Sequence, residues 1–267
     1  MSLKLGAHVD QENPLAEAAG RGAEVVQFFL GDPQGWKAPK VAYEGGAAAL
    51  KAAAEAAGLD LFVHAPYLVN VATTNNRIRI PSRKILQQQL DAAASIGAKG
   101  LIVHGGHVGK GDDPEVGFDN WRKCIERADL AVPLLIENTA GGENAMARQL
   151  DRITRLWDAV QASGNEHVDR VGFCLDTCHF HAGGEQLSDV VEKVKAITGR
   201  IDLVHANGSR DAFGSGADRH SNFDEGEIDP ADIVTVVRQA GAPVVVETPN
   251  NEHGQKADID YLRAQLA

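Results

Sequence analysis

Six short apolar segments of this chain each end in a side chain that can bind a metal ion, and this repeated pattern limits the folds open to it. The segments close on three histidines and three carboxylates, which are His64, His104, Glu137, Asp176, His205 and Glu247. A strand that is apolar along its length and polar at its last residue is buried within a sheet and opens onto a site. We therefore expect six buried strands that direct their last side chains toward one place.

Short β-rich runs alternate with longer segments rich in Ala, Glu, Lys and Arg, which is the pattern of βα units in a parallel sheet. Eight strands are expected, near residues 3–8, 24–29, 59–64, 100–104, 133–137, 171–176, 201–206 and 243–247. The clearest helices are expected over residues 82–96, 115–128, 144–164, 188–197 and 232–241. Ser82 is the expected N-cap of the first of these, and Gly97, Gly164 and Gly241 stand where helices should stop.

Eight strands that alternate with helices close most naturally into a barrel of the (β/α)₈ type, whose sites lie at the C-terminal ends of the strands. A length of 267 residues, 43% of them hydrophobic, suits one such barrel. An open, doubly wound sheet would instead gather its ligands at one switch point. We expect residues 1–267 to form a single (β/α)₈ TIM barrel, in the α/β class, with a metal cluster at the C-terminal ends of its strands.

Cellular context follows from what the sequence lacks. No apolar run is long enough to cross a bilayer, and the first residues lack the pattern of a signal peptide, so a cytoplasmic protein with no membrane partner is expected. No protein partner is implied, and a monomer is expected. Cys124, Cys174 and Cys178 are too few for a disulfide framework and form no Cys-x-x-Cys pair. They are expected to be buried, reduced thiols.

Two close-spaced pairs, Asp176-Thr-Cys-His179 and Asp218-Arg-His220, add donors beside the strand-end set and indicate a third metal position. Imidazole and carboxylate donors suit zinc, manganese or iron. We expect three divalent ions, zinc first, with manganese or iron as alternatives at one or more positions. Cys178, between Asp176 and His179, stays open as a nucleophile or ligand, although its neighbours are the better metal donors.

A formal charge of −11 argues mildly against a nucleic-acid partner, because phosphate binding usually requires a basic surface. Three divalent ions would add six positive charges, bring the total to about −5 and concentrate the positive field in the site. Charge alone therefore does not decide the partner.

The loops that follow two strands carry groups suited to nucleic-acid contact. After His64 come Tyr67, Leu68 and Asn70, followed by several arginines, which suit phosphates and a disturbed base stack. Gln34 lies on a Gly-flanked loop that could probe a ligand.

Taken together, the motifs resemble those of the endonuclease IV family, the metal-dependent apurinic/apyrimidinic endonucleases among the xylose isomerase-like barrels. The resemblance runs from Gly6-Ala-His8 to the last strand. It includes His64-Ala-Pro-Tyr67-Leu, Val-His104-Gly-Gly, Ile-Glu137-Asn-Thr-Ala-Gly, Leu-Asp176-Thr-Cys-His179, Val-His205-Ala-Asn207, Gly-Ala-Asp218-Arg-His220 and Val-Glu247-Thr-Pro.

The resemblance implies a hydrolase of DNA repair that cuts the phosphodiester on the 5′ side of an abasic site and leaves a 3′-hydroxyl. It assigns one metal to His64, His104 and Glu137, a second to Glu137, Asp176, His205 and Glu247, and a third to His179, Asp218 and His220. Glu137 and Glu247 would be the catalytic residues, with Glu247 also orienting the attacking water. Expected contacts to abasic double-stranded DNA are Gln34, Tyr67, Leu68, Asn70 and Arg219.

Three positions depart from the family pattern. Gln34 stands where Arg is common, Gly208 where Asp usually follows His-x-Asn, and Asp224 where Gly is usual. The change at Gly208 predicts the loss of a carboxylate that supports His205.

Two other functions are compatible with such a barrel. A sugar isomerase or epimerase would use one or two metals held mainly by carboxylates, which explains the strand ends but not His179, Asp218 and His220. A barrel that binds DNA or metal without cutting is the second alternative.

Overall fold

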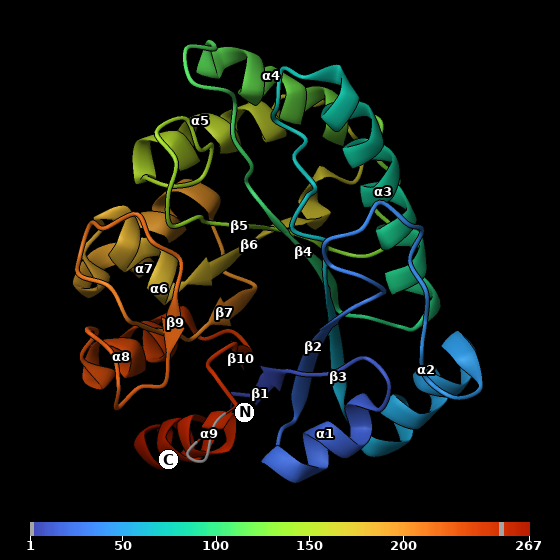
Figure 1. The fold of residues 1–267 in the computed structure, drawn as a ribbon, viewed down its shortest axis with the longest axis vertical. Coiled ribbons are helices and arrows are strands. Elements are labelled where there is room, and N and C mark those ends of the chain that lie inside the picture. Colours follow the sequence, from blue (N-terminus) through green and yellow to red (C-terminus); the bar gives the residue numbers. More distant parts are fainter. Residues whose placement is uncertain (1–2, 251–253) are drawn as a thin grey trace.

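Eight parallel strands close into a barrel in a computed structural model, which describes residues 3–250 and 254–267. Around the barrel the order is β1, β2, β3, β4, β5, β6, β7, β10 and back to β1, as predicted for a (β/α)₈ fold (Figure 1). The strands are β1 Leu5–His8, β2 Val25–Phe29, β3 Asp60–His64, β4 Gly100–His104, β5 Leu134–Glu137, β6 Val171–Asp176, β7 Leu203–His205 and β10 Val244–Val246. A short antiparallel hairpin, β8 Gly208–Ser209 with β9 His220–Ser221, follows β7.

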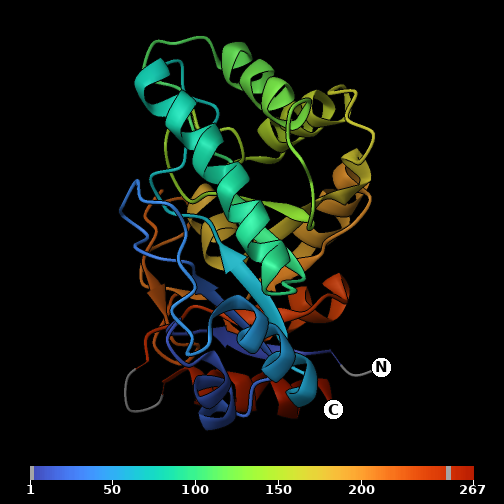
Figure 2. The same cartoon turned by 90° about the vertical axis from the view of Figure 1, so that its right-hand side faces the viewer.

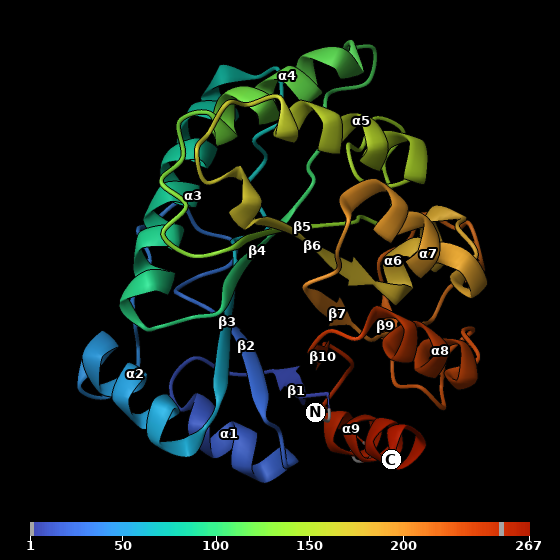
Figure 3. The same cartoon turned by 180° about the vertical axis from the view of Figure 1, so that it is seen from behind.

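Helices surround the strands on the outside, as Figures 1 and 3 show from opposite sides. They are α1 Pro14–Arg21, α2 Gly46–Ala57, α3 Asn76–Ser95, α4 Pro114–Ile125, α5 Leu150–Gln161, α6 Thr177–Gly183, α7 Leu187–Thr198, α8 Pro230–Ala240 and α9 Gly254–Leu266. The longest, α3, runs along the outer wall (Figure 2). A 3₁₀ turn, Val168–Arg170, leads into β6.

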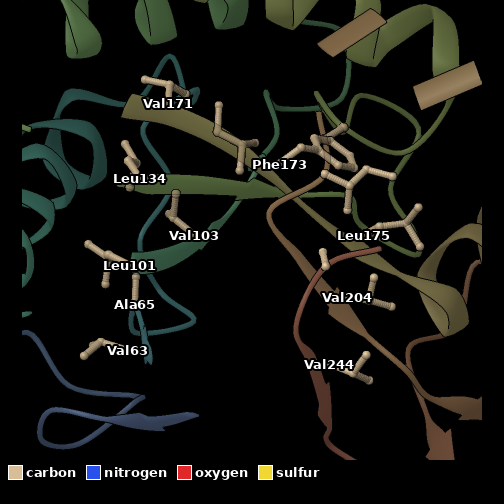
Figure 4. Packing of buried hydrophobic residues seen from close by; sticks show 14 of the residues in the cluster. Val63, Ala65, Leu101, Val103, Leu134, Val171, Phe173, Leu175, Val204 and Val244 are labelled. Carbon is tan, nitrogen blue, oxygen red and sulfur yellow. The ribbon is translucent and has the colours of Figure 1, made fainter. Parts of the chain in front are cut away.

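Alternate residues of each strand face the helices and form one continuous apolar core between the two layers. Val63 on β3, Val103 on β4 and Phe173 on β6 belong to it and are almost fully buried (Figure 4). Burial on both sides explains why the strands read as nearly unbroken apolar runs in the sequence.

The residues that face the barrel interior form a second, smaller apolar cluster, with one member from each of seven strands. They are Val25, Phe62, Ile102, Leu135, Cys174, Leu203 and Val245. On the eighth strand, Gly6 pairs with both Val25 and Val245 and lies at the same level. Gly6 has no side chain to contribute, and a Cβ built on it would fall on the carbonyl oxygen of Val25. The closed strands therefore leave room only for glycine at this point.

Two predicted helix starts were wrong. The helix expected at residue 82 begins at Asn76, because the Asn75 side chain accepts a hydrogen bond from Arg77 N and the helix tolerates Pro81 in its second turn. Ser82 is not a cap, since its hydroxyl accepts from Asn70 N at 2.9 Å and so joins the helix to the loop before it.

The helix expected from residue 144 begins at Leu150. The residues before it form turns and bends: Ala145 makes an isolated bridge to His107, and Met146 N donates to Gly106 O at 2.8 Å. The other predicted helices and the strands lie within about three residues of their expected ends, and α1, α2, α6 and α9 had no predicted range.

All three cysteines are buried free thiols, as predicted. Across residues 3–250 and 254–267, none of the helices combines the length and apolarity needed to cross a membrane.

Replacing Gly6 with Ala should destabilise the barrel, because the added methyl group would collide with the backbone of the paired strand. Overpacking of this kind costs about 1–3 kcal/mol. Gly20→Ala in α1 is the matched control, since nothing lies within 4 Å of a Cβ built there. Denaturant unfolding should give a lower free energy of unfolding for Gly6→Ala than for wild type and no loss for Gly20→Ala. Equal values for the two variants would contradict the packing argument.

Candidate metal centre

Glu137, the last residue of β5, is fully buried and lies at the centre of the strand-end side chains. Its Oε2 atom lies 3.1 Å from His64 Nε2 and 3.2 Å from His104 Nε2. Its Oε1 atom lies 3.0 Å from His205 Nδ1 and 3.3 Å from His179 Nδ1. Four imidazoles from four elements thus converge on one carboxylate, which is the arrangement required of a bridging ligand.

Two groups of ligand atoms share this carboxylate, and the atoms of each lie within 4.8 Å of one another. The first group is His64, His104 and Glu137, and the second is Glu137, Asp176, His205 and Glu247. These are the two sets that the sequence predicted, and the structure brings together every member of both.

The third predicted set lies beside the first two. Asp218 Oδ1 is 3.1 Å from His179 Nε2 and 3.2 Å from His220 Nε2. Helix α6 starts directly after β6 with Asp176 as its N-cap, whose Oδ1 accepts a hydrogen bond from His179 N at 2.7 Å. This cap places His179 one turn above the strand end. The thiol of Cys178 is also within 4.8 Å of ligand atoms of Asp218 and His220, so a thiol ligand at this position stays open.

Two buried nitrogens indicate that a cation belongs in the third group. His179 Nε2 and His220 Nε2 are buried, and although both lie within 3.2 Å of Asp218 Oδ1, neither makes a well-aligned hydrogen bond within residues 3–250 and 254–267. Leaving a buried polar atom unpartnered costs about 1–3 kcal/mol. A divalent ion between these nitrogens and Asp218 would satisfy both, and mixed imidazole and carboxylate donors are those that zinc, manganese and iron accept. The residues therefore fit divalent metal.

Contacts to backbone carbonyls hold three of the imidazoles in orientations that suit metal binding. His64 Nδ1 donates to Ala65 O at 2.7 Å, and His179 Nδ1 donates to Asn138 O at 2.8 Å. His220 Nδ1 faces the carbonyl oxygen of Glu247 at 3.4 Å. Because a carbonyl only accepts, each Nδ1 must carry the proton, and the lone pair of each Nε2 is left for a metal.

Two buried asparagines orient the carboxylates of the second group. Asn207 Nδ2 donates to Asp176 Oδ2 at 2.7 Å, while Asn207 Oδ1 accepts from Glu247 N at 2.8 Å. Asn138 forms a pair of hydrogen bonds with the backbone of Asp176, at 2.8 and 2.9 Å. Sequence reasoning did not assign these roles, although each asparagine lies one or two residues after a predicted ligand.

Sequence reasoning also missed His8 and Gln27, which lie in the same layer as the ligands. Gln27 is fully buried, donates to Glu247 Oε1 at 2.6 Å and lies 3.0 Å from His8 Nδ1. The spacing between interior residues is the signal that could have found them. Every strand-end ligand lies two residues after a member of the interior cluster, and Gln27 lies two residues after Val25. His8 follows Gly6 by the same spacing.

The histidines keep the central carboxylates ionised. Burial opposes ionisation of Glu137, but His205 foremost and His104 next hold the pKa of this carboxyl well below its usual range. Burial also opposes ionisation of Glu247, and His205 again lowers its pKa. For Asp176 burial wins and raises the pKa. The lowered pKa of Glu137 and of Glu247 favours the ionised forms that bind a cation.

Three predicted DNA contacts lie on two loops at the mouth of the site. Tyr67 is 55% exposed, and its ring centroid lies 5.8 Å from that of His64. Tyr67 N donates to Pro33 O at 2.9 Å. This hydrogen bond joins the loop of Tyr67 to the loop that carries the exposed residue Gln34. Leu68 is half-buried beside them.

The other two predicted contacts are engaged within the protein. Asn70 is only 8% exposed, and its amide donates to His107 O at 2.9 Å and accepts from His107 N at 3.2 Å. Arg219 is exposed, but its guanidinium donates to both carboxylate oxygens of Asp211, one of them at 2.8 Å.

Two adjoining cavities mark the space open to a substrate. One, of about 320 Å³, is lined by His8, His64, Tyr67, His104, His179, Asp218, His220, Glu247 and Gln255. The other, of about 270 Å³, includes Tyr67, Leu68, Asn70, His104, His107 and Thr139 in its lining. Tyr67 and His104 border both, so the metal cavity continues toward the loop predicted to contact DNA.

The packing of the hairpin beside the third group explains one departure from the family pattern, the glycine at position 208. A Cβ on Gly208 would lie 2.6 Å from Ser221 Oγ and 2.8 Å from Ser221 O, so the hairpin excludes any larger residue without a shift. In this chain the nitrogen of His205 that faces away from Glu137 lies beside Gln27, with Gln27 Oε1 2.7 Å from His205 Nε2. Asp224 is exposed in the loop that follows the hairpin.

Comparison with known proteins agrees with this geometry. Residues 15–265 match a family described as Xylose isomerase-like TIM barrel. The chain is 56% identical over 264 residues to the probable endonuclease 4 of Mycobacterium marinum, covering 99% of each protein. It superposes on the crystal structure of endonuclease IV from Thermus thermophilus with a TM-score of 0.81 at 26% identity, covering 98% of both chains. A D-tagatose 3-epimerase-like protein shares the fold at a TM-score of 0.77 and 17% identity, covering 99% of this chain and 97% of its own.

Asp218→Ala should remove the metal of the third group and leave the others, because the Asp218 carboxylate lies 3.1 Å from His179 Nε2 and 3.2 Å from His220 Nε2, whereas Asp176, the other acid near these histidines, also belongs to the second group. Elemental analysis of the purified protein should show one divalent ion fewer per chain than wild type. Asp224→Ala, an exposed acid in a neighbouring loop, is the control and should keep the wild-type content. An unchanged metal content in Asp218→Ala would rule out this assignment.

Proposed function

This chain belongs to the endonuclease IV family of xylose isomerase-like barrels, and from that premise we propose that it hydrolyses the phosphodiester bond 5′ to abasic sites in double-stranded DNA, leaving a 3′-hydroxyl. The observation that carries the proposal is the convergence of three metal-binding groups on Glu137 and Asp218 in a chain that matches its relative over its full length. The nine donors would hold three divalent ions, with zinc as the first choice and manganese or iron as alternatives.

Ions bound at these positions would lower the pKa of water, bind phosphate oxygens and neutralise the charge of the departing alkoxide. The protein's own part is to hold ionised carboxylates where that chemistry occurs. Glu137 is anchored by histidines on both of its oxygens, so its position is fixed. Glu247 is ionised and lines the cavity, so its carboxylate can orient an attacking water and accept a proton from it.

Selectivity for a lesion follows from the cost of reaching this site. A normal nucleotide must be unpaired and unstacked, at a cost of a few kcal/mol, before its phosphate can enter a recessed cavity, whereas an abasic sugar has little stacking to lose. Kinking of the duplex is therefore easiest at the lesion. Tyr67, Leu68 and Gln34 lie on the two joined loops at the cavity mouth, and we propose that they enter the minor groove there.

The sugar epimerase alternative explains fewer of the converging metal-binding side chains than the proposed function does. A sugar epimerase on this fold would use one or two metals, which leaves the His179, Asp218 and His220 group without a purpose. A barrel that binds DNA or metal without cutting would use the same side chains, and the incision experiment below distinguishes it from the proposed function. We further propose that the enzyme acts as a monomer.

The decisive experiment incubates metal-loaded protein with a duplex that carries one abasic-site analogue, with and without chelator, and measures product sizes. We expect incision immediately 5′ to the analogue, loss of incision with chelator and no incision of intact duplex. Glu247→Gln should slow incision about 10²–10⁴-fold, the usual contribution of a positioned acid or base, while it still binds the lesion. Absence of incision by fully loaded wild type would refute the proposal, and isomerisation of small ketoses would be assayed next.

Tyr67→Ala should weaken binding to the abasic duplex about 10-fold or more, because stacking on an aromatic ring contributes about 1–3 kcal/mol per base. Binding to intact duplex should change less, since the ring has no gap to enter. Tyr67→Phe is the matched variant and should retain the preference for the lesion, because the ring carries the effect. Equal losses on both duplexes would show that Tyr67 does not read the damage. Equilibrium binding under non-cleaving conditions measures both affinities.

A further inference from the structure

Gln27 makes three side-chain contacts inside the barrel, to one residue of β1, one of β7 and one directly after β10. Its Oε1 atom lies 2.7 Å from His205 Nε2, and its Nε2 atom lies 2.6 Å from Glu247 Oε1 and 3.0 Å from His8 Nδ1. The side chain is fully buried, so no water competes for these contacts. Both amide hydrogens and the amide oxygen therefore have partners.

The chemistry of the partners fixes which way the amide points. The Glu247 carboxylate only accepts hydrogen bonds, so the nitrogen of the amide must face it. The oxygen is then left to face His205 Nε2, which must carry a proton to donate. In the reverse orientation the amide oxygen would lie against a carboxylate oxygen. His205 is thereby held in the Nε2-protonated tautomer.

With the Nε2 proton directed to Gln27, Nδ1 is the nitrogen of His205 that can give its lone pair to a metal. Nδ1 is the atom that faces the second group of ligands, 3.0 Å from Glu137 Oε1 and 3.3 Å from Glu247 Oε2. The imidazoles of His64, His179 and His220 show their Nδ1 atoms to backbone carbonyls and their Nε2 atoms to the metal groups. His205 is turned the other way, and the acceptor on its far side is a side chain.

We propose that Gln27 is a positioning residue for the second metal group, which sets the tautomer of His205 and the rotamer of Glu247 with one amide. This inference rests on the metal centre of the proposed function and adds a residue that no metal touches. β2 supplies no metal ligand itself, but through Gln27 it orients two of them, His205 at the end of β7 and Glu247 directly after β10.

Gln27→Leu tests the proposal, because leucine fills similar space without a donor or an acceptor. The matched control is Gln89→Leu, which replaces another buried glutamine, 1% exposed, on the outer helix α3. Zinc-loaded proteins are dialysed against increasing concentrations of chelator, and the zinc retained per chain is measured. Loss of a partner that orients a ligand weakens metal binding about 10–100-fold. We expect one zinc per chain to leave Gln27→Leu at correspondingly lower chelator concentration, while Gln89→Leu follows wild type.

Retention of all zinc by Gln27→Leu at wild-type chelator concentrations would overturn the proposal. A second measurement needs no variant and so stands even where Gln27→Leu does not fold. Nitrogen NMR of histidine-labelled, zinc-loaded wild type should show His205 bound through Nδ1, with a slowly exchanging proton on Nε2. Zinc on His205 Nε2 would overturn the proposal. Neither measurement uses DNA, so a protein that passes both and cuts no abasic duplex contradicts the proposed function alone.

Discussion

The two-residue period of a strand in a closed barrel is the constraint on which the site depends. Seven apolar side chains and the bare backbone of Gly6 fill one level of the interior. The side chains two residues further along each strand must then point into the same space, one level nearer the mouth. That next level is Gln27, His64, His104, Glu137, Asp176, His205 and Glu247, with His8 above Gly6. The polar layer is thus buried from below by the barrel's own core and opens only toward the loops.

Burying so many ionisable groups requires that they compensate one another. An isolated carboxylate in such a place would be protonated, because the desolvation of its charge is too costly. Glu137 avoids this by lying within 3.3 Å of four imidazole nitrogens. The compensation is less complete in the third group, where two imidazole nitrogens lie near Asp218 Oδ1 but make no well-aligned hydrogen bond in the described part of the chain. This imbalance is chemical evidence for a cation that is independent of the likeness to other proteins.

The strands and their terminal ligands could be predicted because an apolar run that ends in a polar residue reports both burial and direction. The same rule failed for Gln27, because its strand continues through two further apolar residues, Phe28 and Phe29, and no ending marked it. Helix starts were less predictable where tertiary contacts decide them. Proline usually opens a helix, yet Pro81 lies within α3, whose first turn is capped by Asn75 instead. Whether a ring nitrogen faces a carbonyl or an amide depends on strands far apart in sequence, and no local pattern contains that information.

The distribution of charge bears on how an acidic chain can attract a polyanion. Arg219 lies next to two predicted ligands, yet its guanidinium is paired with Asp211 and contributes little net positive field. Tyr67, an exposed side chain at the cavity mouth, is a neutral phenol, and partial burial together with the neighbouring carboxylates raises its pKa further, to about 12. The residues nearest the cavity therefore offer shape and aromatic surface but little positive charge. Bound ions would add positive charge inside this cavity, so metal loading and local DNA affinity are expected to be coupled.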